Sequence, residues 1–293
     1  MVTGNNNNQS ARTYQKQFAG LAQAVFGVKA VFGPTFGALQ ALDGVQNNKT
    51  AFSVKTNNVP VVVGKYSVDA NTAFGTGTGK SSRFGDRTEI IYEDLDIPYT
   101  DEWNFHEGID RATVNNDVNA ALANRLELQA QALTRKFNKA HGQFLVDSAA
   151  EDLGAATDVT KLFNAASKKF LELEVDVPIR AYVSADVYNN IVDLGLTTSA
   201  KRSTVSIDDN GVTKFKGFTI TEVPDQYLAG AQVIFAPDNI GRTFTGINTA
   251  RTIESEDFDG VALQGHGKFG QWVLEDNKQA ILTAGVSKPA ATK

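Results

Sequence analysis

The feature that most constrains the fold is a stretch of about 36 residues, ending near Ala150, in which apolar side chains recur every three or four positions without a proline. This spacing places them on one face of a single long α-helix. At 1.5 Å per residue the helix is about 54 Å long, which exceeds the width of a small domain. It must therefore run along the outside of the protein or brace an extended object. Its apolar positions are Val118, Leu122, Leu126, Leu133, Phe137 and Phe144.

The segment before this helix predicts a long hairpin. Thr50–Val63 and Thr88–Ile97 are rich in β-branched residues, which indicates two strands. The intervening Asp69–Arg87 is dominated by Gly, Ser, Thr and Asn and forms a flexible basic tip. A two-stranded ribbon is marginally stable alone, and a loop of about 20 residues is unusual inside a compact domain. We therefore expect the ribbon to lie on a partner surface.

The N-terminal region reads as an arm. Residues 1–17 are polar and cannot bury enough surface to order themselves. Residues 18–42 are apolar but rich in glycine, which predicts extended or short-turn structure packed on another element. Lys29 and Pro34 interrupt this run, so it fits neither a signal peptide nor a membrane span. We expect cytoplasmic synthesis and no membrane association.

The region after the long helix predicts a compact α/β unit followed by a strand-rich tail. Asp158 and Ser184 are suited to cap two helices, the second ending at Gly195. Strands are expected at Val177–Val183, Thr204–Ile207, Val212–Phe215, Gly217–Val223 and Gln232–Ala236. The tail, Thr249–Ala284, is strand-like with a turn at Asp259-Gly260, and Pro289–Lys293 is a loose end.

Charge is divided unevenly along the chain, although the net charge is only −5. Up to Thr88 there are nine basic and three acidic residues, whereas from Glu89 onward there are 19 basic and 30 acidic residues. Such asymmetry favours a nucleic-acid or membrane contact for the basic part, or contact between opposite parts of neighbouring copies. A solvated basic face is the simpler alternative.

No pattern in the sequence supports catalysis or cofactor binding. The Gly-rich run at 75–81 misses the phosphate-loop spacing by one residue, because Phe74 stands where glycine is needed. The three histidines are far apart and there is no cysteine. The acidic run from Glu93 to Asp110 lacks the calcium-loop pattern. We expect no catalytic residue, no cofactor and no metal, and therefore no enzyme.

The order of these parts resembles the major capsid proteins of tailed bacteriophages, which have the Hong Kong 97-like fold. Three segments resemble it most: Ile179–Tyr188, Gly217–Pro224 and Arg251–Gly265 continuing to Ile281. The resemblance implies an α+β fold with an N-terminal arm, an E-loop hairpin, a long spine helix, a peripheral domain and an axial domain. The corresponding ranges are 1–45 for the arm, 46–100 for the E-loop ribbon, 101–153 for the spine helix and peripheral domain, 154–248 for the axial domain, and 249–293 for the return to the peripheral domain and the C-terminal tail.

The resemblance also implies a function. Such a protein self-assembles into hexamers and pentamers of an icosahedral head that encloses double-stranded DNA without sequence specificity, and it matures by subunit rotation as DNA is packaged. It is assembled in the host cytoplasm and ends in the virion. A portal protein is an expected partner. A separate scaffolding protein is also expected, because only a short arm precedes the ribbon.

Charged residues of the ribbon are the candidate contacts between subunits. Lys80, Arg83 and Arg87 at the tip are expected to face carboxylates of an adjacent copy, with Glu93, Asp94 and Asp96 as candidates. Arg12 and Lys16 of the arm are weaker candidates for contact with packaged DNA. Lys65 and Lys80 are placed for the cross-link that some capsid proteins form, but no acceptor is identifiable, and a noncovalent shell is favoured.

Two other functions stay open at this point. One is an encapsulin-like protein compartment with the same fold, which encloses enzymes in place of a genome. The other is a secreted adhesin, which requires cleavage of residues 18–42 as a signal peptide.

Overall fold

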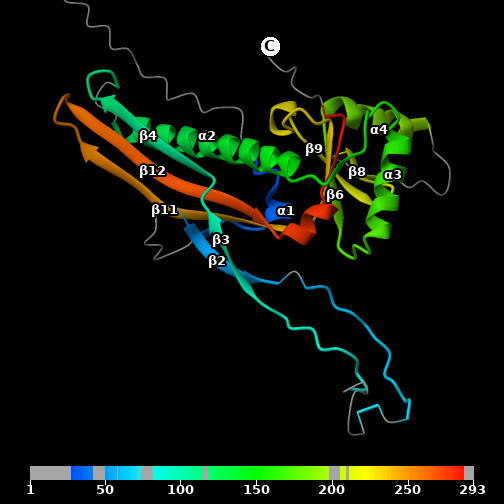
Figure 1. The fold of residues 1–293 in the computed structure, drawn as a ribbon. Helices are drawn as coiled ribbons and strands as arrows, with labels where there is room; N and C mark the ends of the chain where they lie inside the picture. Colours follow the sequence, from blue (N-terminus) through cyan, green and yellow to red (C-terminus); the bar gives the residue numbers. More distant parts are fainter. Residues whose placement is uncertain are drawn as a thin grey trace, which may run out of the picture.

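The computed structural model describes residues 28–41, 50–57, 59–70, 72–73, 82–114, 118–197, 205–208 and 211–286. Over these ranges the chain forms a four-stranded sheet with a long helix along it, a seven-stranded sheet covered by helices, and a ribbon that projects from the body (Figure 1). The mixed helix-and-sheet class expected from the sequence is confirmed.

The long helix is α2, Val118–Asp147. Its 30 residues correspond to about 45 Å at the standard rise. It ends three residues before Ala150, because the Ala150 N–H donates to the carbonyl of Ile281 and the chain enters β5, Glu151–Asp152. Pairing with a distant strand therefore ends the helix earlier than its apolar periodicity predicts.

The four-stranded sheet has the order β1-β11-β12-β4. Its strands are β1, Gln40–Ala41, β11, Gly241–Glu254, β12, Gly260–Val273, and β4, Asp101–Asp110. The turn predicted at Asp259-Gly260 is confirmed, since β12 begins at Gly260. The predicted start of the tail at Thr249 is wrong, because β11 begins at Gly241 and pairs there with Val273. Between β12 and the last strand the chain forms a short 3-10 helix, η2, Glu275–Ala280, where a strand was expected.

The seven-stranded sheet has the order β5-β13-β10-β6-β9-β8-β7. The remaining strands are β6, Ile179–Val183, β7, Val205–Asp208, β8, Gly211–Phe215, β9, Phe218–Glu222, β10, Val233–Pro237, and β13, Leu282–Ala284. Two helices, α3, Val159–Glu172, and α4, Ala185–Thr197, supply apolar side chains to one face. The other face meets α1, Gly33–Phe36, the C-terminal half of α2, and η1, Asp225–Tyr227.

Alternation along β6 explains how one sheet serves two cores. Ala181 and Val183 join the cluster that contains Phe163 of α3. Tyr182 points to the opposite cluster, where its hydroxyl lies 2.7 Å from the hydroxyl of Thr35 in α1. Successive side chains of a strand point to opposite faces, so a continuous apolar strand is the pattern of a sheet buried on both sides.

Both predicted helix caps are confirmed. The Asp158 carboxylate accepts a hydrogen bond of 3.0 Å from the backbone N–H of Lys161 at the start of α3. The Ser184 hydroxyl accepts one of 3.4 Å from the backbone N–H of Val187 at the start of α4. Each side chain satisfies one of the amide groups that the first turn of a helix leaves without an intrahelical acceptor.

The ribbon is an antiparallel pair, as predicted, but its strands are shorter. They are β2, Thr50–Thr56, and β3, Glu93–Pro98. The predicted strand residues up to Val63 and from Thr88 to Tyr92 lie in two legs that the structure describes without regular strand. Both legs are largely solvent-exposed, so no buried face favours one pairing register and β-propensity alone does not form the ladder.

The two sheets exchange strands across the domain limits expected from the sequence. β11 enters the four-stranded sheet before residue 248, and β13 joins the seven-stranded sheet although it follows residue 249. The chain thus crosses from one sheet to the other and back, which ties the two parts of the body together.

Candidate assembly surface

The base of the ribbon is fixed to the four-stranded sheet by an apolar cluster. Ala51 and Ile97 are buried with Phe244 of β11. The ring of Phe52 meets that of Phe244 edge to face, with the centroids 5.1 Å apart. These contacts set the direction in which the ribbon leaves the body, and Figure 1 shows its legs extending well beyond both sheets.

The legs of the ribbon expose large apolar side chains to solvent. Val61, Val62 and Val63 on the outgoing leg are between 80 and 92% exposed. On the returning leg, Ile90, Ile91 and Tyr92 are between 57 and 60% exposed. Contiguous exposed apolar surface of this kind marks an interaction site in a soluble protein. We refer to these six residues as the apolar legs.

The tip of the ribbon is held by local contacts. The rings of Tyr66 and Phe84 pack edge to face at 5.1 Å. Arg83 is half-buried, and its Nε donates to the Thr72 carbonyl at 3.3 Å. Arg87 is exposed on the returning leg, whereas Lys80 lies outside the described residues. Of the three basic candidates, the structure therefore presents Arg87 to solvent and gives Arg83 a role within the tip.

The acidic candidates lie at the other end of the ribbon, on β3. Glu93, Asp94 and Asp96 are exposed there. Asp94 forms an ion pair of 3.0 Å with Lys55 on β2, and Asp96 accepts a hydrogen bond from Ser53. The legs separate this end from the basic tip, so the chain does not bring the two sets together. The arm candidates Arg12 and Lys16 lie outside the described residues.

Polar bridges attach α2 to β4. Arg125 on α2 donates to the Glu107 carboxylate through Nε at 2.7 Å and through Nη2. Gln129, one turn later, donates to the same carboxylate at 2.6 Å. The hydrogen bond from Arg125 lowers the pKa of Glu107 and outweighs the opposing effect of burial. Glu107 is therefore held as a carboxylate.

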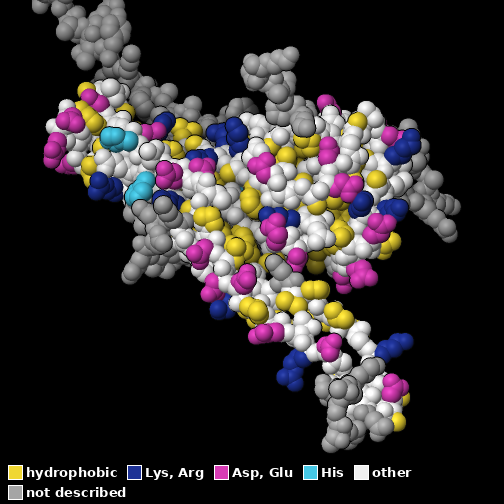
Figure 2. All heavy atoms as spheres, viewed as in Figure 1, with side chains coloured by type: hydrophobic (Ala, Val, Ile, Leu, Met, Phe, Trp, Pro, Cys, Tyr) yellow, Lys and Arg dark blue, Asp and Glu magenta, His cyan; other side chains and the backbone are white. Residues whose placement is uncertain are grey.

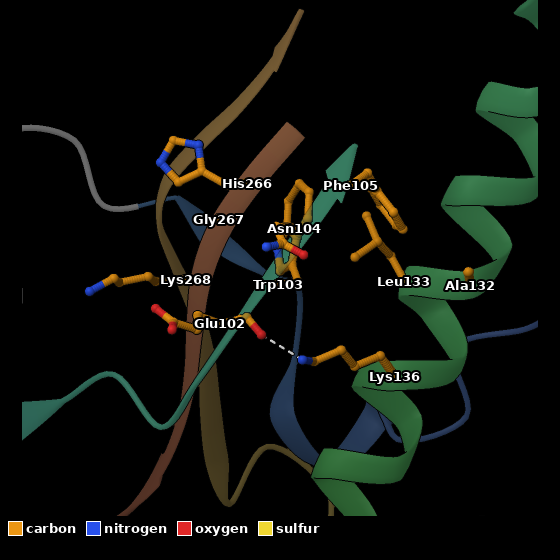
Figure 3. Close-up of a pocket in the computed structure, with 10 residues that line it drawn as sticks. All are labelled: Glu102, Trp103, Asn104, Phe105, Ala132, Leu133, Lys136, His266, Gly267 and Lys268. Atoms are coloured by element: carbon orange, nitrogen blue, oxygen red, sulfur yellow. Dashed lines mark hydrogen bonds between the residues drawn. The ribbon is translucent and has the colours of Figure 1, made fainter. Parts of the chain in front are cut away.

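Farther along the same seam, Lys136 forms a second bridge. Its Nζ lies 3.2 Å from the Asp101 carboxylate and 2.5 Å from the carbonyl oxygen of Glu102. Figure 3 shows this contact at the edge of a pocket of about 430 Å³, with Trp103 and Leu133 among its walls. The bridges at both ends hold the helix over a seam that side chains do not fill completely.

Charged side chains cover the outer surface without a single dominant sign in the view of Figure 2. Acidic groups gather at the far end of the four-stranded sheet, where Arg111 pairs with Asp259 at 2.6 Å and with Glu254 at 3.4 Å. Within the described ranges, no group of three or more acidic or histidine side chains has an arrangement that could hold a metal ion. None of the helices in those ranges has the length and apolar character needed to cross a membrane.

The sequence analysis missed the apolar legs as exposed surface, because it assigned their residues to strands. The available signal was the run of three valines after Pro60 on one side of a Gly-rich loop and Ile90-Ile91-Tyr92 on the other. Consecutive apolar residues do not alternate, so at most every second one could face a core. The pair Glu107 and Arg125 had no sequence signal, since it depends on how α2 lies against β4.

Comparison with known proteins identifies the fold. No protein-family model matches the chain, and no curated protein sequence matches it. Among solved structures, the capsid of cyanophage P-SCSP1u matches with a TM-score of 0.67 at 12% identity, covering 94% of each chain. The mature capsid of bacteriophage PhiM1 matches with a TM-score of 0.61 at 12% identity, covering 92% of each chain. A structure from Mycobacterium phage Che8 matches with a TM-score of 0.62 at 16% identity, covering 91% of this chain and 95% of that one.

These matches extend over nearly the whole of every chain compared, so they concern the complete architecture and not one shared motif. The chain therefore has the fold of these phage proteins. The capsid-protein fold expected from the order of sequence elements is confirmed.

Proposed function

We propose that this chain is a major capsid protein that self-assembles into hexamers and pentamers of an icosahedral phage head enclosing double-stranded DNA. The observation that carries the proposal is the ribbon, whose apolar legs have no core of their own and extend away from the body. The fold shared with phage capsid structures supports it. In such a shell the role of the chain is structural and not enzymatic, and its place is the virion.

Each part of the fold then has a role in the shell. The ribbon acts as the E-loop that lies on a neighbouring subunit, and α2 acts as the spine. The four-stranded sheet corresponds to the peripheral domain and the seven-stranded sheet to the axial domain. Burial of the apolar legs against a neighbour supplies the hydrophobic contribution to assembly, at roughly 25 cal/mol per Å² of apolar surface removed from water.

Charge adds direction to this contact. Lys80, Arg83 and Arg87 of one copy are proposed to meet carboxylates of an adjacent copy, with Glu93, Asp94 and Asp96 as candidates. The separation of tip and base along the ribbon supports pairing between copies over pairing within one copy. Opposite charges across an interface fix its register and suppress wrong arrangements more than they add affinity. Reversing the charge of all three basic residues should weaken assembly and change its salt dependence, and unchanged assembly would remove this part of the proposal.

Assembly in the host also requires partners of other kinds. We expect a separate scaffolding protein, a portal protein at one vertex, and DNA packaged without sequence specificity, with assembly in the host cytoplasm and no membrane step. Contact of Arg12 and Lys16 with the packaged DNA is a secondary expectation.

The test is the size of the assembled species. The full chain is expressed alone and with a scaffolding protein, and sedimentation velocity is combined with negative-stain imaging of any fast species. Pentamers, hexamers or closed shells support the proposal. A monomer under both conditions would rule it out. A shell that copurifies with an enclosed enzyme would indicate a protein compartment in place of a phage head.

A further inference from the structure

A groove that no described segment fills runs between α2 and the four-stranded sheet, on the side of β11. It has a volume of about 390 Å³. Leu126, Ala130 and Leu133 of α2 line one wall, and Leu263 of β12 and Ala250 of β11 belong to the other. Leu126 is 46% exposed although it lies in this groove. An apolar groove beside a helix is a site where another apolar segment can be buried.

The described chain begins at the end of this groove. Asn138 of α2 is 2% exposed and holds the segment that precedes α1. Its Nδ2 donates to the carbonyl of Lys29 at 2.8 Å, and its Oδ1 accepts from the N–H of Val31 at 3.1 Å. The next residue, Phe32, packs one turn farther along α2, against Gly142. The chain therefore runs along α2 toward the C-terminal end of the helix.

Followed in the opposite direction, the same path leads into the groove. Thr134 lines the small pocket next to Ala30, and Ala130 lines the groove. Ala130, Thr134 and Asn138 are spaced four residues apart, so they lie on one face of the helix. The residues that precede Gly27 thus approach the groove along a continuous strip of α2.

The residues that come next along this path have the matching chemistry. Residues 18–27 contain Phe18, Leu21, Val25 and Phe26, and none of the ten is charged. The distance along α2 from Asn138 to Leu126 is about 18 Å at the helical rise. Ten extended residues reach about 33 Å, so the segment is long enough to fill the groove from its own chain.

We propose that residues 18–27 occupy this groove in the same molecule, with their apolar side chains against Leu126, Ala130 and Leu133. The segment then covers the β11 side of the seam, while Glu107 and Lys136 contribute to the polar bridges on the β4 side. The inference concerns the single subunit, and it is independent of whether the chain forms a shell.

The test uses the absence of cysteine from the chain, since any introduced thiol is the only one present. Leu126→Cys places a thiol in the groove, and Leu171→Cys places one on α3, where Leu171 is 80% exposed. Each is made in the unaltered chain and in a chain with Phe18, Leu21, Val25 and Phe26 changed to serine. The rate of reaction with a maleimide is measured on unassembled subunits.

The groove thiol should react about tenfold faster when the segment carries the serines, because docking of the segment controls its accessibility. The thiol at position 171 should react equally in both backgrounds. Equal rates for the groove thiol in both backgrounds overturn the proposal. If Leu126→Cys does not fold, Ala130→Cys provides the same comparison.

Dilution identifies the source of the protecting segment. Protection that is unchanged over a tenfold dilution, at concentrations where sedimentation shows monomers, supports docking within one chain. Protection that is lost on dilution overturns it, since a second copy then covers the groove.

Discussion

Arg125 on α2 grips the carboxylate of Glu107 on β4 through two of its side-chain nitrogens. This two-point contact fixes the rotation of the helix about its own axis as well as its distance from the sheet. A single point charge in place of the guanidinium would give only the distance, because the planar fork of arginine is what matches both carboxylate oxygens.

Replacing Arg125 with methionine should lower the free energy of unfolding by about 1 kcal/mol at neutral pH, since the arginine is about half-exposed and solvent screens the pair. The pKa of Glu107 is lowered in the folded state, so this contribution is present above the ordinary pKa of the carboxyl and disappears as the pH falls through the lowered value. Urea unfolding of both proteins at pH 7 and pH 3 measures it. Lys168→Met, which removes an exposed pair with Glu172, is the control and should change little. An equal loss at both pH values would contradict the assignment to Glu107.

His141 makes the fold sensitive to mild acid. It is buried beside Phe36, its Nδ1–H donates to the Phe137 carbonyl at 2.5 Å, and its Nε2 has no partner among the described residues. Burial lowers its pKa from 6.5 to about 4. The unfolded chain therefore binds a proton between these values that the folded chain refuses, so stability rises with pH across this window and is lost as the pH falls.

We expect the free energy of unfolding to be about 2 kcal/mol lower at pH 5 than at pH 8 because of this one group. His141→Leu should remove most of the difference, whereas His106→Gln, at an exposed position on β4, should leave it in place. Chemical unfolding of unassembled subunits at a series of pH values provides the measurement. A pH profile that is the same with and without His141 would show that other groups are responsible.

Asn138→Ala should destabilise the subunit by about 2 kcal/mol, because it leaves the carbonyl of Lys29 and the N–H of Val31 without their partners in a half-buried place. Gln143→Ala on the exposed face of the same helix loses a bond to Asp147 and serves as the matched control. Its effect should stay within about 0.5 kcal/mol. Denaturant midpoints decide between the two, and similar values for both variants would mean that Asn138 does not hold the segment in solution.

Gly142 allows α2 and η1 to touch. A Cβ at this position would overlap the carbonyl oxygen of Tyr227, which is backbone and has little freedom to move. Gly142→Ala should therefore cost about 3 kcal/mol or prevent folding. At Gly33 the corresponding space is open, and Gly33→Ala should be tolerated. Thermal unfolding of the two single variants tests the contrast, which fails if the alanines have equal effects.

The apolar legs should matter for association and not for folding. Changing Val61, Val62 and Val63 together to serine should leave the free energy of unfolding of the subunit within about 0.5 kcal/mol, because these side chains are exposed. The same change should abolish shell formation in sedimentation and imaging. Leu171→Ser, at an exposed apolar position on α3, is the control and should still assemble. Normal shells from the triple variant would show that the legs are not an interface.

The parts of the fold that the sequence predicted well are those set by local periodicity. The repeat of three and four predicts α2, and Asp158 and Ser184 mark the starts of α3 and α4. The ribbon strands were predicted too long, because β-branched residues favour a strand only where a neighbour fixes the register. The bridge between Glu107 and Arg125 and the groove beside Leu126 follow from how α2 lies on the sheet, which no local pattern encodes.

The position of β13 has a consequence for how the protein is made. This strand follows every other strand in chain order, yet it pairs with β10 and β5 inside the seven-stranded sheet. A nascent chain that has not yet released Leu282–Ala284 from the ribosome leaves the edge of β10 open and the side chain of Phe235 uncovered on that flank. Completion of the body is thus delayed until translation has passed these residues. Interrupted products retain an open strand edge, which makes them substrates for chaperones and proteases.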